Sequence, residues 1–314
     1  MNSNGITVLS LFDGISCGRI ALERAGVPVK AYYASEIKSI AIKCTMHNYP
    51  DTIQIGDVTK VHYADGILYA ENRAYEVGKV DLLIAGSPCQ DFSLLKYFNR
   101  KTNLGLQGTK SRLFYEFLRV LIEINPTYFL LENVKMKKSN ERLLTDYLGV
   151  EPIYINSALV SYQNRPRLYW TNIPGVTVPD DRHINFQDYI ERDVEKCRTY
   201  KVNRTPSREK MWNNGNGYIG IGTCDNVTFA EKISCITRKQ DRSPNSGLIA
   251  FEDFCRYLTR EEIEIGQTLP IGYTDCLTYN QMQDVCGDAW TVDVIAHIFS
   301  FLPFVRGINN EHHT

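Results

Sequence analysis

The first half of the chain alternates short apolar runs with segments whose apolar residues recur every three or four positions. Apolar runs of strand length occupy residues 6–11, 29–34, 81–85, 128–131, 151–156 and 167–171. Helical spacing of apolar residues predicts helices over 14–25, 37–47 and 111–124. Such alternation predicts a doubly wound α/β fold with a mostly parallel sheet.

After about Pro174 this pattern ends. Residues 174–250 are polar, with weak periodicity and a run of Asn and Gly at 213–217, which predicts a smaller domain of loops and short strands. Helical spacing returns at 290–301. We therefore expect a first domain over 1–173, a second over 174–268, and a C-terminal segment, 269–314, that returns to the first.

Composition excludes several classes of protein. The formal net charge is -1, so nucleic-acid binding would need local basic patches. The nine cysteines form no CxxC pair and no zinc-type cluster, which indicates reduced thiols and predicts no metal site. The N-terminus has no signal-peptide pattern and no apolar stretch reaches membrane-spanning length, so we expect a soluble, cytoplasmic protein without a membrane partner.

A single cysteine follows the apolar run at 81–85. Gly86 and Pro88 end the run and place Cys89 on a loop, at the carboxyl end of a predicted parallel strand. Open α/β sheets bind their ligands at that edge, so the Cys89 thiol is a candidate nucleophile. A lone cysteine beside an apolar strand is more often a small buried hydrophobe, and this segment alone does not decide between the two.

The first strand leads into a glycine turn typical of nucleoside-binding folds. Phe12, Asp13 and Gly14 follow the strand, and Glu36 stands at the end of the next one. Glycine allows close approach of the backbone to a ligand, and the acidic residue can bind ribose hydroxyls. Asp57, after a third strand-like segment, can accept a bond from an adenine amino group. The spacing is not GxGxxG, so a turn required only for packing remains an alternative.

Two further polar groups end or begin apolar strands. Glu132 closes the run at 128–131, and a carboxylate buried there without a partner is costly, which makes it a candidate acid or hydrogen-bond donor to a ring nitrogen. The alternative is a glutamate that caps the next helix. Arg165 and Arg167 flank a proline and can hold a carboxylate or phosphate, although a solvated surface pair is the commoner meaning.

Together these segments resemble the C5-cytosine DNA methyltransferase family nearly from end to end. The family's motifs correspond here to Phe12-Asp13-Gly14, Pro88-Cys89-Gln90, Glu132-Asn133-Val134, Gln163-x-Arg165-x-Arg167 and a late segment with Arg256, Glu262, Gln267, Pro270 and Tyr273. The residues within these motifs are similar to those of the catalytic domain of the animal de novo methyltransferases. The short length of the chain is similar to that of a compact bacterial or phage enzyme. One departure is Gly287-Asp288, where most members carry Gly-Asn.

The resemblance implies a Rossmann-like methyltransferase sheet over 1–173 and a target-recognition domain over 174–268. It implies methyl transfer from S-adenosyl-L-methionine to C5 of a flipped cytosine in double-stranded DNA, as in restriction-modification systems. Catalysis is expected from Cys89, Glu132, Arg165, Arg167 and Gln163, with Arg165 steadying the Glu132 carboxylate. Cofactor contacts are expected from Phe12, Asp13, Gly14, Ile15, Glu36, Ile37, Asp57, Val58, Pro88, Leu113, Asp288 and Trp290. DNA contacts are expected from Gln90, Ser93, Lys96, Arg100, Lys101, Asn133 and Arg238.

Two local runs of basic residues fit a DNA substrate. The loop 96–112 contains no acidic residue, and residues 196–210 carry Lys196, Arg198, Lys201, Arg204 and Arg208 against Glu209. The alternatives are a tRNA cytosine methyltransferase of the same fold, a catalytically silent relative and an unrelated nucleotide-binding oxidoreductase. The sequence does not indicate which DNA sequence is recognised or whether the enzyme is paired with a restriction enzyme. It also does not decide between a monomer and an oligomer.

Overall fold

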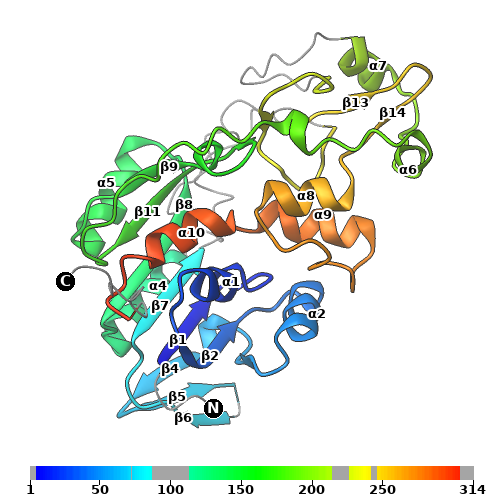
Figure 1. Ribbon diagram of the computed structural model, residues 1–314. Coiled ribbons are helices and arrows are strands. Elements are labelled where there is room, and N and C mark those ends of the chain that lie inside the picture. The colour runs from blue at the N-terminus through cyan, green and yellow to red at the C-terminus, as the bar shows by residue number, and fades with distance from the viewer. Residues whose placement is uncertain (1–4, 72, 87–112, 214–225, 242–245, 305–314) are drawn as a thin grey trace, which may run out of the picture. The chain divides into compact units, whose positions relative to one another are not determined.

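The computed structural model describes residues 5–71, 73–86, 113–213, 226–241 and 246–304 (Figure 1). Its contacts divide the chain into two units. The sheet unit comprises 1–155, 166–178 and 295–314, and the second unit comprises 156–165 and 179–294. The expected boundaries differ from this division in three places: residues 156–165 and 269–294 belong to the second unit, and residues 174–178 belong to the sheet unit. Each unit is described by itself below.

A seven-stranded sheet in the order β3-β2-β1-β7-β8-β11-β9 forms the sheet unit. Its strands are β1 (Ile6–Leu11), β2 (Val29–Ser35), β3 (Ile53–Gln54), β7 (Leu82–Gly86), β8 (Tyr128–Val134), β9 (Ile153–Asn156) and β11 (Pro166–Thr171). β1 pairs in parallel with β2 and β7, β7 pairs in parallel with β8, and β11 is antiparallel to β8. The doubly wound, mostly parallel sheet is therefore confirmed, and its strand order reverses between β1 and β7, where such sheets bind ligands.

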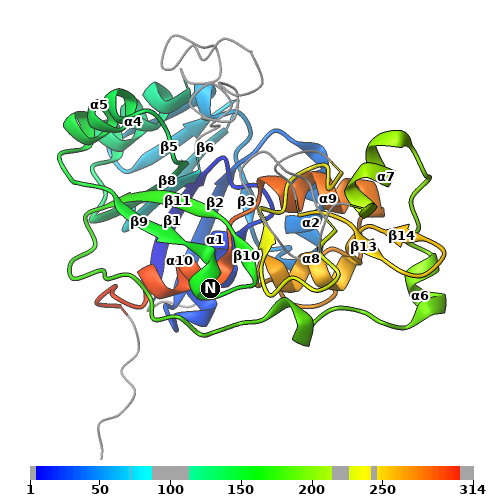
Figure 2. The same ribbon diagram turned by 90° about the horizontal axis from the view of Figure 1, so that it is seen from above.

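Helices cover both faces of this sheet, because right-handed crossovers to either side of β1 put them there. α1 (Cys17–Arg24) and α2 (Ser39–Asn48) flank β2 in the chain, whereas α4 (Leu113–Ile124) and α5 (Lys138–Leu148) flank β8. Figure 2 shows α1 on the opposite face from α4 and α5. Phe114 and Phe117 of α4 are fully buried against alternate strand residues, among them Leu9 and Leu83. This packing holds the strand ends that carry the predicted site.

A three-stranded antiparallel sheet follows β3 and was not predicted. The 3-10 helix η1 (Val58–Lys60) leads into β4 (Val61–Ala64), β5 (Ile67–Ala70) and β6 (Arg73–Glu76). Asp65 and Gly66 join the first two strands with φ of 50° and 81°. This pair with positive φ is the sequence signal of a tight hairpin. The helix α5 was also missed, because its apolar residues are few.

The second unit consists of short elements. These are η3 (Ser157–Leu159), β10 (Gln163–Asn164), η4 (Phe186–Asp188), α6 (Val194–Arg198), α7 (Pro206–Asn213), β12 (Ile233–Ser234), β13 (Ile249–Ala250), β14 (Cys255–Arg256), α8 (Arg260–Gly266) and α9 (Tyr279–Asp288). The unit boundary falls within α10 (Val292–Phe299). Thr259 and Thr278 start α8 and α9 with capping boxes, in which side chain and backbone bond reciprocally.

Candidate active site

The turn after β1 is held in an unusual backbone conformation. Phe12, Gly14 and Ser16 have φ of 57°, 61° and 58°. Left-handed conformations cost a residue other than glycine about 1 kcal/mol or more, so other contacts must hold this turn. The Asp13 backbone N–H donates to the Ser35 carbonyl at 3.1 Å, which ties the turn to β2. A Cβ at Gly14 would meet no atom within 4 Å, so the turn faces open space there.

The Asp13 carboxylate belongs to this turn and accepts hydrogen bonds from the hydroxyl groups of neighbouring side chains. Tyr32 donates to Oδ1 at 2.8 Å, and Ser16 donates to Oδ2. Burial raises the pKa of Asp13 from 3.8 to about 6, and the hydrogen bonds oppose the rise. The sequence indicated Asp13 as a site residue, but it did not indicate Tyr32 and Ser16 as its hydrogen-bond partners. The available signal was that each carries a hydroxyl within a predicted element, Tyr32 in a strand and Ser16 in a helix.

Glu36 joins the same turn to the end of β2. Its Oε2 accepts from the Gly14 N–H at 2.8 Å, and its Oε1 accepts from the N–H groups of Ile37 and Lys38, both at 2.8 Å. The expected neighbours Gly14 and Glu36 are therefore in contact. The apolar side chain of Ile37 is 74% exposed beside them.

The other expected cofactor residues of the sheet unit follow β1 and β3 or begin α4. Asp57 caps η1 by accepting from the Thr59 N–H at 2.9 Å, while Val58 is buried. Ile15 is buried in the turn, and Leu113 begins α4 and packs against the core. Asp57 follows β3 at the edge where the parallel strands end, so it shares that edge with Glu36.

Glu132 lies in β8 and forms an ion pair with Arg167 of β11. Arg167 Nε is 2.8 Å from Glu132 Oε1, and the side chains are only 13% and 10% exposed. The arginine that contacts this carboxylate is therefore Arg167, whereas Arg165 was expected there. The reason is positional: Arg167 lies in β11, whose register with β8 places it beside Val134, but Arg165 precedes that strand.

Arg165 and Gln163 are buried in the second unit, where they bind backbone groups. Arg165 donates to the carbonyls of Ile236 at 3.0 Å and Ala289 at 2.6 Å. Gln163 Nε2 donates to the Gly266 carbonyl at 2.5 Å. In the structure these side chains therefore join segments of the second unit to one another.

The remaining expected residues are dispersed. Asp288 is exposed, Trp290 is half-buried before α10, and both belong to the second unit. Arg238, an expected DNA contact, pairs with Asp284. Asn133 is fully buried, and its Oδ1 accepts from the Val134 N–H. Outside the described residues lie Pro88, Cys89, Gln90, Ser93, Lys96, Arg100 and Lys101.

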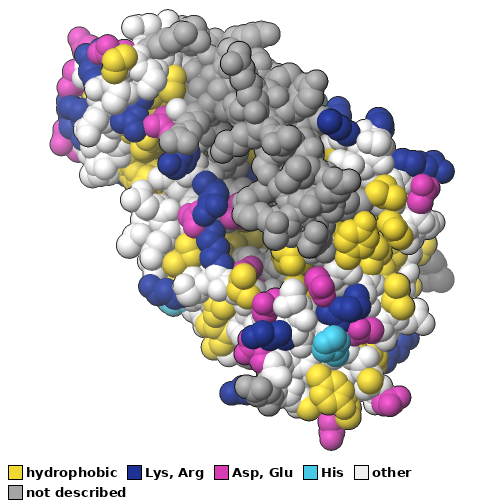
Figure 3. All heavy atoms as spheres, turned by 180° about the vertical axis from the view of Figure 1, so that it is seen from behind, with side chains coloured by type: hydrophobic (Ala, Val, Ile, Leu, Met, Phe, Trp, Pro, Cys, Tyr) yellow, Lys and Arg dark blue, Asp and Glu magenta, His cyan; other side chains and the backbone are white. Residues whose placement is uncertain are grey.

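Most basic residues of the run 196–210 are paired with carboxylates. Lys196 lies 2.9 Å from both Glu191 and Glu261, and Arg208 lies 2.8 Å from Asp241. Arg198 and Arg204 also pair with acidic side chains. The excess of positive charge counted along the sequence is therefore largely neutralised, mostly by carboxylates that lie outside the run. On the face in Figure 3, Lys and Arg side chains likewise lie beside Asp and Glu.

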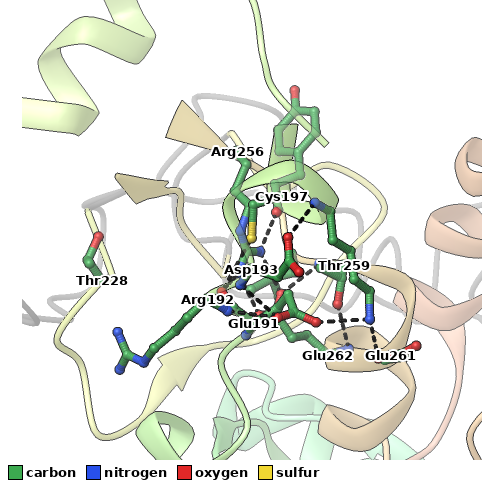
Figure 4. Close-up of polar contacts among 12 residues, drawn as sticks. Glu191, Arg192, Asp193, Cys197, Thr228, Arg256, Thr259, Glu261 and Glu262 are labelled. Atoms are coloured by element: carbon green, nitrogen blue, oxygen red, sulfur yellow. Dashed lines mark hydrogen bonds and ion pairs between the residues drawn. The ribbon is translucent and has the colours of Figure 1, made fainter. Parts of the chain in front are cut away.

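Arg256 and Glu262, both in the family-like late segment, form a buried ion pair (Figure 4). Two nitrogens of Arg256 donate to the Glu262 carboxylate at 2.7 Å, and the side chains are 0% and 1% exposed. Arg256 also donates to the Glu191 carbonyl at 2.8 Å. Because removing one member of a buried ion pair leaves the other charge without its partner, we expect loss of either side chain to destabilise the second unit.

Neither a metal-binding cluster nor a membrane-spanning helix is present among the described residues. Within the described ranges, no group of three or more His, Cys, Asp or Glu side chains is placed to hold a metal ion. No helix among the described residues is long and apolar enough to cross a bilayer.

Comparison with known proteins agrees with these motifs. Residues 6–149 match the family model of the C-5 cytosine-specific DNA methylases. The chain is 32% identical over 224 residues to the orphan methyltransferase M.Rho11sI of Bacillus phage rho11s, covering 66% of this chain and 39% of the phage protein. It is 35% identical over 141 residues to the type II methyltransferase M.NlaIV of Neisseria lactamica, covering 44% of this chain and 30% of that protein. The chain thus spans less than two fifths of the length of these relatives.

Solved structures share the fold at low sequence identity. The Entamoeba histolytica methyltransferase EhMeth superposes with a TM-score of 0.70 at 14% identity, covering 95% of this chain and 97% of that one. A Spodoptera frugiperda DNMT2 gives 0.64 at 17% identity, with coverage of 95% and 99%. The motifs and the matched model together show that residues 6–149 form a domain of the C-5 cytosine-specific DNA methylase family.

Proposed function

We propose that the chain is a DNA (cytosine-5-)-methyltransferase that uses S-adenosyl-L-methionine to methylate C5 of a cytosine flipped out of a specific duplex sequence. The observation that carries the proposal is the Glu132–Arg167 pair at the carboxyl edge of the sheet. Glu132 lies opposite Gly86 in the register of β8 with β7. Cys89 follows Gly86 by three residues, and a chain of that length spans at most about 11 Å, so the Cα atoms of Cys89 and Gly86 cannot be farther apart than that.

The residues present fit a nucleoside cofactor at the ends of β1, β2 and β3. The turn offers open space at Gly14, and Oε2 of Glu36 has lone-pair capacity beyond its bond from the Gly14 N–H. We assign the ribose hydroxyls to Glu36, an apolar ring contact to the exposed Ile37, and the adenine amino group to Asp57. S-adenosyl-L-methionine, when bound, supplies an electrophilic methyl group.

The chemistry assigned to the side chains follows from the ring of cytosine. C5 is a poor nucleophile until a group adds at C6, so the Cys89 thiolate forms a bond to C6 and the displaced π electrons make C5 enamine-like. Glu132 hydrogen-bonds or protonates N3, where charge develops. After C5 has been alkylated, a base from solvent takes the C5 proton, and the electrons of that bond form the C5–C6 double bond as the C6–S bond breaks. The Cys89 thiolate departs, and N3 returns to Glu132 any proton that it received.

Arg167 supports Glu132 in this role. The guanidinium holds Oε1 at 2.8 Å, which fixes the orientation of a carboxylate that is almost excluded from water. Because C6 is inaccessible in a stacked duplex, the base must leave the helix. We assign phosphate contacts during this step to Lys96, Arg100 and Lys101.

The test is methyl incorporation into plasmid DNA and into tRNA, followed by bisulfite sequencing of the DNA. We expect methylcytosine in a defined duplex sequence, and a rate lower by about 10²–10⁴ for Glu132→Gln. The matched control is Glu76→Gln on the edge of β6, which is exposed. Incorporation into tRNA but not into duplex DNA contradicts the proposal, as does an unchanged rate in Glu132→Gln.

A further inference from the structure

Asp13 links the strained turn to β2 and, through Ser16, to α2. Its carboxylate accepts from Tyr32 of β2 and from Ser16. The Ser16 hydroxyl also lies 3.1 Å from the Thr45 hydroxyl of α2, and Thr45 donates to the Gly14 carbonyl at 3.4 Å. The carboxylate therefore binds hydroxyl groups of β2 and of the turn directly, and it is linked to α2 through the Ser16 hydroxyl. The turn itself has positive φ at Phe12, Gly14 and Ser16.

The groups that set the pKa of Asp13 include three hydroxyls and the Glu36 carboxylate. Burial raises that pKa most, Glu36 raises it further, and hydrogen bonds from Ser10, Ser16 and Tyr32 lower it. Arg19 of α1 lies over the Tyr32 ring at 5.6 Å, but its guanidinium is bonded to Asp51 and Thr52. α2 contributes the neutral Thr45. The result is a pKa of about 6, close enough to neutrality for the protonation state to change under ordinary conditions.

An ionised carboxylate can only accept hydrogen bonds, whereas its protonated form must donate one. With Asp13 ionised, the Tyr32 and Ser16 hydroxyls both donate to it, as the geometry requires. Protonation turns one of these contacts around and removes the charge that organises them. The backbone at Gly14, which would approach the cofactor, is then held less firmly.

We propose that the ionised Asp13 carboxylate is a positioning residue: it holds the Phe12–Ser16 turn in the form that binds the cofactor, and its protonation weakens that binding. The inference rests on the proposed function, since it requires a nucleoside cofactor at this turn. It goes beyond that function by assigning the turn a proton-dependent affinity, which Tyr32 tunes.

The experiment measures the dissociation constants of S-adenosylmethionine and S-adenosylhomocysteine by calorimetry between pH 5 and 8. For the wild type we expect both constants to rise about tenfold from pH 7.5 to pH 5, with an inflection near pH 6. Asp13→Asn should bind both ligands weakly at every pH and lack this inflection. Comparing the pH profiles of the wild type and this variant removes any contribution from titration of the ligand itself. Tyr32→Phe should move the inflection to higher pH, because it removes a hydrogen bond that lowers the Asp13 pKa.

A role in folding alone would not move a pH inflection of binding, and the control Asp65→Asn alters an exposed carboxylate in the same unit. The wild-type profile needs no variant, and Tyr32→Phe keeps the test valid if Asp13→Asn does not fold. An inflection that persists in Asp13→Asn, or tight binding that is independent of pH in the wild type, overturns the inference and leaves the proposed function intact. Folded wild type that binds neither ligand overturns both.

Discussion

Replacing Asp13 by asparagine is expected to stabilise the protein above pH 6, although it weakens cofactor binding. The folded-state pKa of about 6 lies above the value of 3.8 that an unperturbed aspartate has. The folded state therefore holds the proton more tightly than the unfolded state, and this contribution to stability is complete below pH 4 and lost as the pH rises through 6. A difference of about 2 pKa units corresponds to about 3 kcal/mol at most.

Urea unfolding of the wild type and Asp13→Asn at several pH values measures this difference directly. We expect the two free energies of unfolding to be similar near pH 4, and the variant to gain up to about 3 kcal/mol by pH 7.5. Taking the difference removes the titration of all other groups, and Asp180→Asn controls for loss of an exposed carboxylate. A variant that is less stable than the wild type at pH 7.5 would refute the reasoning, because the hydrogen bonds would then outweigh the cost of burying the charge.

The buried contacts give further predictions. Arg167→Met should lower the free energy of unfolding by about 3–5 kcal/mol, because it strands the Glu132 carboxylate, and adding Glu132→Gln should restore part of the loss in a double-mutant cycle; strictly additive effects would contradict the pairing. Gly287→Ala should cost about 1–3 kcal/mol, because a Cβ there would lie 2.4 Å from the Arg238 backbone nitrogen. Thermal melting at neutral pH checks the second prediction, and unchanged stability would rule out that close approach.

Apolar patterning predicted the central strands because strands buried on both faces are continuous apolar runs. Glu36 and Asp57 were located correctly at strand ends, since parallel strands end at one edge of the sheet. The partner of Glu132 could not be predicted, because Arg165 and Arg167 differ only in which side of a strand boundary they occupy. That boundary depends on the pairing of β11 with β8, which is a long-range contact.

The charges of the second unit show a different limit. Lys196 and Arg208 belong to a basic run in the sequence, but their partners Glu261 and Asp241 come from 65 and 33 residues away. A count of charges in a window cannot include such partners. The Asp13 network was missed for the same reason, because Tyr32 and Thr45 reach the turn only once β2 and α2 have packed.

The central claim is that the Cys89 thiolate attacks C6 of an extruded cytosine, and covalent trapping tests it most directly. A duplex that carries 5-fluorocytosine in the methylated sequence cannot lose fluorine from C5, so the adduct should persist. In the presence of S-adenosyl-L-methionine, we expect a denaturation-resistant protein–DNA complex with the wild type and with the control Cys276→Ala, but none with Cys89→Ala. An adduct that survives in Cys89→Ala, or its absence in wild type that methylates the unmodified duplex, would contradict the account.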